Sequence, residues 1–183
     1  MSQPRIAPLD PPYPADVQAA FDTVMRGAAP LTLFRVVARN PRVLTRMMAG
    51  GLLDRGSISI RQRELMILRT TALCGAEYEW GVHVAAFGPK AGWTPEALRA
   101  SAYGAADDPA WSPDERLIVR LADALYATHD VDESLWRDLK RGFADEQLVE
   151  LVMLAGLYHA VSFVLRAFRV PLEPHAPRFS AAA

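Results

Sequence analysis

The chain of 183 residues is poor in the residues that build disulfides and metal centres, with one cysteine, Cys74, and four histidines. A single cysteine cannot form an intrachain disulfide and cannot build a cysteine-ligated zinc site. No two histidines have the HxxxH or HxH spacing, so the sequence predicts no metal site. The chain also has no basic run or stripe and a net charge of −1, which argues against binding to DNA or RNA.

The sequence shows no signal for export or membrane insertion. Residues 1–14 resemble neither the apolar core of a signal peptide nor an Arg- and Ser-rich transit sequence. The longest apolar stretch, residues 148–168, is interrupted by Glu150, His159 and Arg166, which makes it too polar for a typical membrane span. We therefore expect a cytoplasmic protein that has no membrane partner.

What the sequence does contain is the composition of a globular protein, with 51% hydrophobic and 22% charged residues. No run alternates apolar and polar residues with period two, whereas apolar residues recur at helical spacing from Ala15 onward. Five of the 14 prolines lie in residues 1–14. We predict an all-α fold with one domain, residues 15–170, between this Pro-rich arm and a Pro-rich tail, residues 171–183.

Start and stop signals divide the predicted domain into helices. Ser57 or Ser59 can cap a helix over residues 60–73, and Gly75 permits a bend. A second helix begins near residue 77, and Gly88-Pro89 should end it. Further cap signals predict helices that start near residues 95, 113, 133 and 145, the last of them reaching about residue 168.

Ionisable residues are concentrated in residues 61–83, RQRELMILRTTALCGAEYEWGVH. At about 100° per residue, Ala76, Glu79 and His83 fall in one stripe of the second helix, so Glu79 and His83 are neighbours able to hydrogen-bond. A carboxylate beside an imidazole fixes its tautomer and raises its pKa, as in a general base. If the two helices pack antiparallel across the bend, Glu64 reaches the same pocket, and the cluster forms a proton-transfer site.

Each of these residues also has a purely structural interpretation. A Glu and a His at positions i and i+4 are often a surface pair that contributes a few tenths of a kcal/mol. Glu64 can instead be a charged helix residue at a subunit interface, and Cys74 can be a small buried hydrophobe or a nucleophile.

Three further residues near the motif leave the same choice open. Tyr78 and Trp80 can belong to the core or to a substrate platform. His159, which follows Tyr158 on the last apolar helix, can be a satisfied core histidine or can face the site.

The same motif carries a family resemblance. Residues 61–83, with the GWTP segment that follows and the late segments WSPDERLIVRLADAL and LVELVMLAGLYHAVSF, resemble the carboxymuconolactone decarboxylase family. This all-helical superfamily also contains the alkyl hydroperoxidase D proteins, and the resemblance covers most of the chain. It implies a helical alkyl hydroperoxidase D-like fold that assembles as a homotrimer or a homohexamer.

The resemblance also separates two kinds of chemistry. In the redox-active branch the motif is a Glu, then Cys-x-x-Cys, then a His four positions after the second Cys. Glu64 and His83 occupy the Glu and His positions, but the two cysteine positions hold Ala76 and Glu79, and Cys74 lies two positions too early. The decarboxylase branch, which acts on small carboxylated lactones without metal or organic cofactor, suits this residue set better.

We therefore predict a cofactor-independent decarboxylase, isomerase or lyase that moves protons on a small organic acid, lactone or carbonyl compound. His83 is the predicted acid or base, Glu79 orients it, and Glu64 is the second proton-handling group. Tyr78, Trp80 and His159 are the predicted substrate-binding residues.

Two other functions remain as alternatives. One is a thiol peroxidase in which Cys74 acts alone, and the other is a non-catalytic helical oligomer that binds a small molecule. Arg69, Arg166 and Arg169 are candidates for holding a substrate carboxylate, and the sequence does not rank them.

An independent signal for assembly comes from residues 148–165, which are apolar around most of the helix circumference. A helix of this kind must be covered on all sides. One protomer can place a single helix at its centre, and residues 67–68 and 118–121 compete for that position. We therefore expect a homo-oligomer, either a trimer or a dimer of trimers, with the Glu64–His83 pocket close to a subunit boundary.

Overall fold

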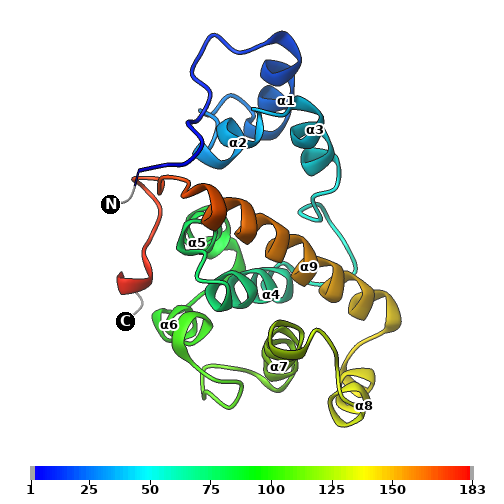
Figure 1. The fold of residues 1–183 in the computed structure, drawn as a ribbon. Helices are drawn as coiled ribbons and strands as arrows, with labels where there is room; N and C mark the ends of the chain where they lie inside the picture. The colour runs from blue at the N-terminus through cyan, green and yellow to red at the C-terminus, as the bar shows by residue number, and fades with distance from the viewer. Residues whose placement is uncertain (1–2, 182–183) are drawn as a thin grey trace.

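The computed structural model describes residues 3–181, and within this range every element is helical (Figure 1). Residues 1–2 of the predicted arm and 182–183 of the predicted tail lie outside the described residues. The elements are α1 Ala15–Met25, α2 Thr32–Val37, α3 Pro41–Ala49, α4 Ile60–Leu73, α5 Glu77–Ala91, α6 Pro95–Tyr103, α7 Pro113–Thr128, α8 Glu133–Gly142, α9 Asp145–Phe168 and the short 3-10 helix η1 Phe179–Ala181. The predicted all-α class is confirmed.

Helix α4 occupies the centre of the molecule. It packs against α5, α6, α7 and α9, and its residues 63–71 are all buried. Its start is fixed by a capping box, in which the Ser59 hydroxyl accepts from Gln62 N and the Gln62 side chain accepts from Ser59 N. Because α4 is enclosed by four helices, each polar side chain on it must find an internal partner.

The α4–α5 hairpin is bent at Gly75, as predicted. Gly75 has φ +63°, a conformation that glycine adopts without steric cost. Helix α5, however, continues past Gly88-Pro89 to Ala91, so the predicted end of this helix is wrong. The actual stop is Gly92, at φ +67°, whose N–H bonds to Gly88 O; Pro89 sits in the last two turns and removes only one hydrogen bond there.

The N-terminal helices α1 to α3 form a cap at one end of the molecule, and α6 to α8 lie at the other (Figure 1). The cap is tied to the end of α9 by the arm, where Arg5 N donates to Phe168 O. The C-terminal tail then crosses α5 at Gly81, where a Cβ atom would collide with Pro177 O. The arm, at Gln3-Pro4, and the start of the tail, at Val170–Leu172, therefore both lie beside the first turn of α5.

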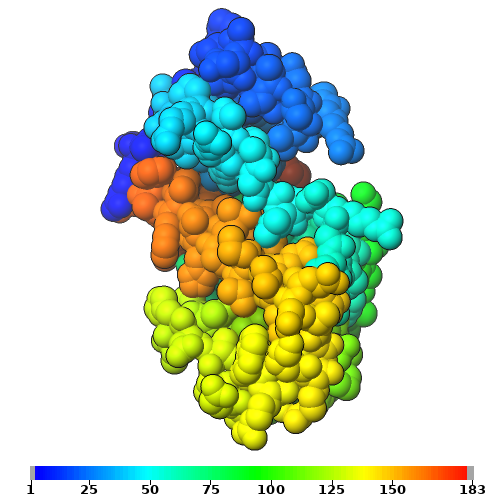
Figure 2. All heavy atoms as spheres, turned by 90° about the vertical axis from the view of Figure 1, so that its right-hand side faces the viewer, coloured from blue at the N-terminus to red at the C-terminus, as the bar shows by residue number. Residues whose placement is uncertain are grey.

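Helix α9 is half core and half surface. Its inner face buries residues that include Leu151, Leu154 and Tyr158, whereas Val149, Met153 and Phe163 are 60–67% exposed. Figure 2 shows this outer face at the surface between the N-terminal cap and helices α7 and α8. With 24 residues and a mean hydropathy of 1.9 over its most apolar 18 residues, α9 is long and apolar enough to cross a membrane; its inner face packs on α4, α5 and α7.

Candidate functional site

The α4–α5 hairpin brings Glu64 and His83 together inside the protein. The Glu64 carboxylate oxygen Oε2 lies 2.7 Å from His83 Nδ1, and the two residues are 0% and 3% exposed. The bend at Gly75 allows this contact because it turns α5 back along α4. A carboxylate this close fixes the imidazole orientation and requires a proton on Nδ1.

The second ring nitrogen of His83 has two neighbours. Tyr158 from α9 places its hydroxyl 3.0 Å from Nε2, and Glu79 Oε1 lies 3.5 Å from the same nitrogen. Tyr158 was not predicted as a site residue, although it is one of few polar residues in the apolar run of α9. Both ring nitrogens of His83 are therefore engaged by groups from three different helices.

Arg63 completes the buried cluster, and it was also not predicted from the sequence. Its Nε and Nη2 lie 2.9 and 2.8 Å from Glu64 Oε1, and its Nη1 donates to Leu53 O at 2.7 Å. The guanidinium also stacks 4.9 Å from the Phe87 ring centre. Because a buried carboxylate needs a counter-charge, Arg63 gives Glu64 the partner that solvent would otherwise supply.

The cluster holds His83 in its charged form. Burial lowers the pKa of His83, but the carboxylates of Glu64 and Glu79 outweigh it and raise the pKa to about 9. At neutral pH the ring is therefore an imidazolium that donates to Glu64 through Nδ1 and to the Tyr158 oxygen through Nε2. Burial and the two carboxylates raise the pKa of Tyr158 well above its ordinary value, so its hydroxyl keeps its proton.

One atom of the cluster lacks a partner. Glu79 Oε2 is buried and makes no hydrogen bond to any described residue. A buried carboxylate oxygen that is left unpaired costs free energy unless a ligand or water satisfies it. The arrangement thus pairs an acid, the His83 imidazolium, with a free carboxylate oxygen that can accept a proton.

Tyr78 and Trp80 flank Glu79 in the sequence, but the structure does not bring them to His83. Each is rotated about 100° from Glu79 around the helix. The Tyr78 hydroxyl donates to Glu173 Oε1 at 2.6 Å and accepts from the backbone of α2, and Trp80 Nε1 donates to Ser101 Oγ at 3.0 Å. Trp80 is 1% exposed and serves as core.

His159 and Cys74 also lie outside the cluster. His159 follows Tyr158 and so faces the outer side of α9, beside the rings of Tyr126 and Phe163. Cys74 is half-buried at the end of α4, and burial raises the pKa of its thiol, which lowers the thiolate fraction available for reaction.

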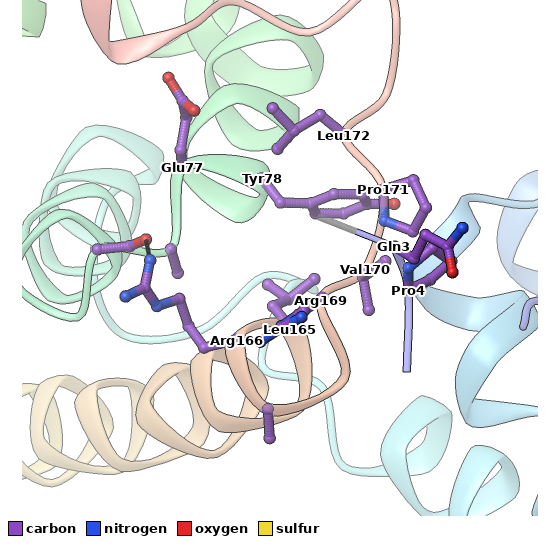
Figure 3. Close-up of a pocket in the computed structure, with 13 residues that line it drawn as sticks. Gln3, Pro4, Glu77, Tyr78, Leu165, Arg166, Arg169, Val170, Pro171 and Leu172 are labelled. Atoms are coloured by element: carbon purple, nitrogen blue, oxygen red, sulfur yellow. Dashed lines mark hydrogen bonds between the residues drawn. The ribbon is translucent and has the colours of Figure 1, made fainter. Parts of the chain in front are cut away.

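Two cavities open on the described part of the chain, and only the smaller is bordered by a residue of the cluster. The larger, about 940 Å³, opens beside the first turn of α5 and the end of α9 (Figure 3). The smaller, about 280 Å³, is bordered by Arg63 and Glu150 under the loop before α4. Within residues 3–181 no group of three or more His, Cys, Asp or Glu side chains is placed to hold a metal ion.

Both the sequence and the fold are similar to those of known proteins. Residues 40–124 match the carboxymuconolactone decarboxylase family. No curated protein matches the chain.

Several solved structures share the fold. An uncharacterised peroxidase-related protein from Silicibacter sp. TM1040 is 21% identical, with TM-score 0.78 over 98% of this chain and 99% of that one. A debrominase in complex with 2,3,4-tribromopyrrole is 14% identical, with TM-score 0.76 over 96% and 94%. A putative antioxidant defence protein AhpD from Agrobacterium tumefaciens is 18% identical, with TM-score 0.65 over 75% and 94%. At these identities the likeness shows the alkyl hydroperoxidase D-like fold alone.

Proposed function

We propose that this protein, of which residues 40–124 match the carboxymuconolactone decarboxylase family, is a cofactor-independent enzyme that transfers protons on a small organic acid, lactone or carbonyl compound. The observation that supports this most is the buried His83 imidazolium beside Glu79, whose Oε1 lies 3.5 Å from His83 Nε2 and whose Oε2 has no hydrogen-bond partner among the described residues. An acid and a base side by side, shielded from water, are what a proton shift between two atoms of one substrate requires.

The charge state of His83 assigns the roles. An imidazolium with a pKa of about 9 starts the reaction as the acid, and Glu79 Oε2 is the base. In an isomerisation, Glu79 removes a proton from a carbon next to a carbonyl group, and His83 delivers one to another atom of the substrate. In a decarboxylation, the C–C bond to the carboxylate breaks and carbon dioxide leaves. The electron pair of that bond moves into the adjacent unsaturated system, and His83, the acid, then protonates a carbon.

Glu64, Arg63 and Tyr158 support these two groups. Glu64 holds the proton on Nδ1, which directs the reactive proton of His83 to Nε2. Arg63 offsets the charge of Glu64, and Tyr158 fixes the other edge of the ring. A group that transfers the proton itself usually contributes 10²–10⁴-fold in rate, and a group that only positions the acid or the base contributes less.

The test uses a small panel of carboxylated lactones and unsaturated acids in D₂O, followed by ¹H NMR. The wild-type protein should exchange a carbon-bound proton for deuterium, or release carbon dioxide, in at least one compound. His83→Asn and Glu79→Gln should lose at least about 100-fold in that rate while keeping the helical circular dichroism. A rate that survives His83→Asn would contradict the proposal.

Cys74→Ser is the matched control for the thiol peroxidase alternative. Because the Cys74 thiol is half-buried with a raised pKa, we expect this variant to keep the full proton-transfer rate. If Cys74→Ser instead abolished activity and the wild type consumed peroxide with an external thiol, the peroxidase alternative would replace our proposal.

We further propose that the enzyme is a homotrimer or homohexamer and that it acts in the cytoplasm. The exposed apolar stripe on α9, which includes Val149, Met153 and Phe163, supports the assembly. Contiguous apolar surface of this kind in a folded chain commonly marks an interface. Partner subunits on this face would cover the side of α9 that the protomer leaves open.

A further inference from the structure

The larger cavity is built by four separate parts of the chain. The first turn of α5, Gly75–Tyr78, forms one wall, and the end of α9, from Leu165, forms another. Gln3-Pro4 of the arm and the start of the tail, Val170–Leu172, complete the rim (Figure 3). With about 940 Å³ it lies within the size range of small-molecule sites, roughly 300–1,000 Å³.

Two arginines give this cavity its charge. Arg166 uses Nη1 to donate to Gly75 O at 3.0 Å, which leaves the rest of its guanidinium free. Arg169 makes no side-chain hydrogen bond or ion pair with any residue in the range 3–181. Glu77 is the one acid among the lining residues, and its Oε1 accepts from Phe179 N. The lining therefore offers two guanidinium groups against one carboxylate that is already engaged.

Apart from Gln3 and the Tyr78 hydroxyl, the remaining side chains that line the cavity are apolar. Figure 3 shows Pro171 and Leu172 beside the Tyr78 ring, with Leu165, Arg166 and Arg169 on the α9 side. Guanidinium groups recognise carboxylates through paired N–H donors, and apolar walls favour a hydrocarbon body. The ligand that fits this surface is an anion with one carboxylate and an apolar body.

Helix α5 contributes residues both to the cavity wall and to the buried cluster. Ala76 lines the cavity, and Glu79 follows it by three residues on the same helical stripe, a rise of about 4.5 Å. His83 is one turn further along, and Tyr158 lies two turns before Leu165 on the facing helix. Of the cluster residues on α5, Glu79 is thus the one nearest to the cavity wall along the helix.

We propose that Arg166 and Arg169 bind the carboxylate of an apolar-bodied organic acid in this cavity, which orients the acid toward Glu79. That this acid is the substrate rests on the proposed function; that the cavity binds it does not. Arg69, the third candidate from the sequence, is unsuited, because its guanidinium is occupied by Asp123 and by Gly104 O.

The test is titration calorimetry with benzoate, phenylacetate and hexanoate, with benzamide as the neutral counterpart of benzoate. At least one carboxylate should bind saturably to the wild type, and benzamide should bind at least about tenfold more weakly than benzoate. The double variant Arg166→Gln/Arg169→Gln should lose at least about tenfold in carboxylate affinity. Arg116→Gln, which removes an exposed arginine on α7, is the matched control and should bind as the wild type does.

Three results would overturn the proposal: no carboxylate of the panel binds, benzamide binds as tightly as benzoate, or the double variant keeps its affinity. Circular dichroism and thermal melting of the double variant show whether it is folded, and ¹H–¹⁵N NMR of the arginine Nε groups in the wild type locates the contact independently.

The same titration separates this inference from the proposed function. His83→Asn should bind the carboxylate normally, because His83 does not line the cavity. Normal binding by a wild-type protein that turns over none of the bound acids would refute the catalytic role and leave the binding site standing.

Discussion

The pH dependence of stability is the sharpest consequence of the buried cluster. In the folded protein the pKa of His83 is raised from its ordinary 6.5 to about 9 by Glu64 and Glu79, against the opposing effect of burial. Between these two values the folded state holds a proton that the unfolded state has released. The stabilisation is therefore fully present below about pH 6.5 and is lost as the pH rises through 9.

The magnitude follows from the width of this window. It spans about 2.5 pH units, and each unit corresponds to ~1.4 kcal/mol, so the free energy of unfolding should fall by about 3 kcal/mol across it. The assay is urea denaturation followed by circular dichroism at several pH values and one protein concentration, because assembly makes stability depend on concentration.

The informative perturbation is Glu64→Gln. It removes the charge that raises the pKa of His83 most directly, while the amide oxygen can still accept from Nδ1. The variant should be less stable at pH 6.5 and should show a flatter dependence up to pH 9. Glu115→Gln is the control: Glu115 is also buried, at 7% exposed, and pairs with Arg61, but its pKa is lowered, so it titrates in acid.

Two outcomes would refute this reasoning. One is a wild-type stability that stays flat or rises between pH 6.5 and 9. The other is a Glu64→Gln variant whose stability changes with pH as steeply as that of the wild type.

Three further predictions concern other parts of the molecule. Tyr158→Phe removes the hydroxyl 3.0 Å from the imidazolium and should lower kcat by about tenfold or more with a stability loss of about 1 kcal/mol, measured by turnover and urea denaturation. Gly81→Ala should detach the tail, because its Cβ would collide with Pro177 O, so proteolysis should cut the tail faster. Gly156→Ala meets open space on α9 and should leave the tail protected. Phe163→Glu places a charge on the exposed apolar stripe and should reduce the oligomer to monomers in light scattering; a monomeric wild type, or an unchanged assembly, would contradict the interface.

Much of the site was predictable because it lies on one hairpin. Glu79 and His83 are joined by helical periodicity, and the glycine at the bend permits the antiparallel packing that brings Glu64 to Nδ1. The helix starts were predictable for a similar reason, since the cap of a helix is encoded within four residues. Ser59 and Ser112 both form capping boxes in the structure.

The parts that were missed depend on contacts between distant residues. Tyr158 comes to His83 from 75 residues away, on a helix whose rotation is set by its packing rather than by any local signal. Arg63 precedes Glu64 in the sequence, where side chains of a helix normally diverge, and only the length of its side chain lets it fold back. The large cavity needs both ends of the chain for its rim, which no periodicity predicts.

The charge state of His83 tests the central claim most directly. Long-range ¹H–¹⁵N NMR of ¹⁵N-histidine-labelled protein, with His83→Asn to assign the signal, reports the protonation of both ring nitrogens. We expect an imidazolium at about pH 7.5 that loses its proton near pH 9, and a lower pKa of His83 in Glu64→Gln. A His83 ring that is neutral at that pH and titrates at or below 6.5 would contradict it, because the buried cluster would then have no acid to transfer a proton.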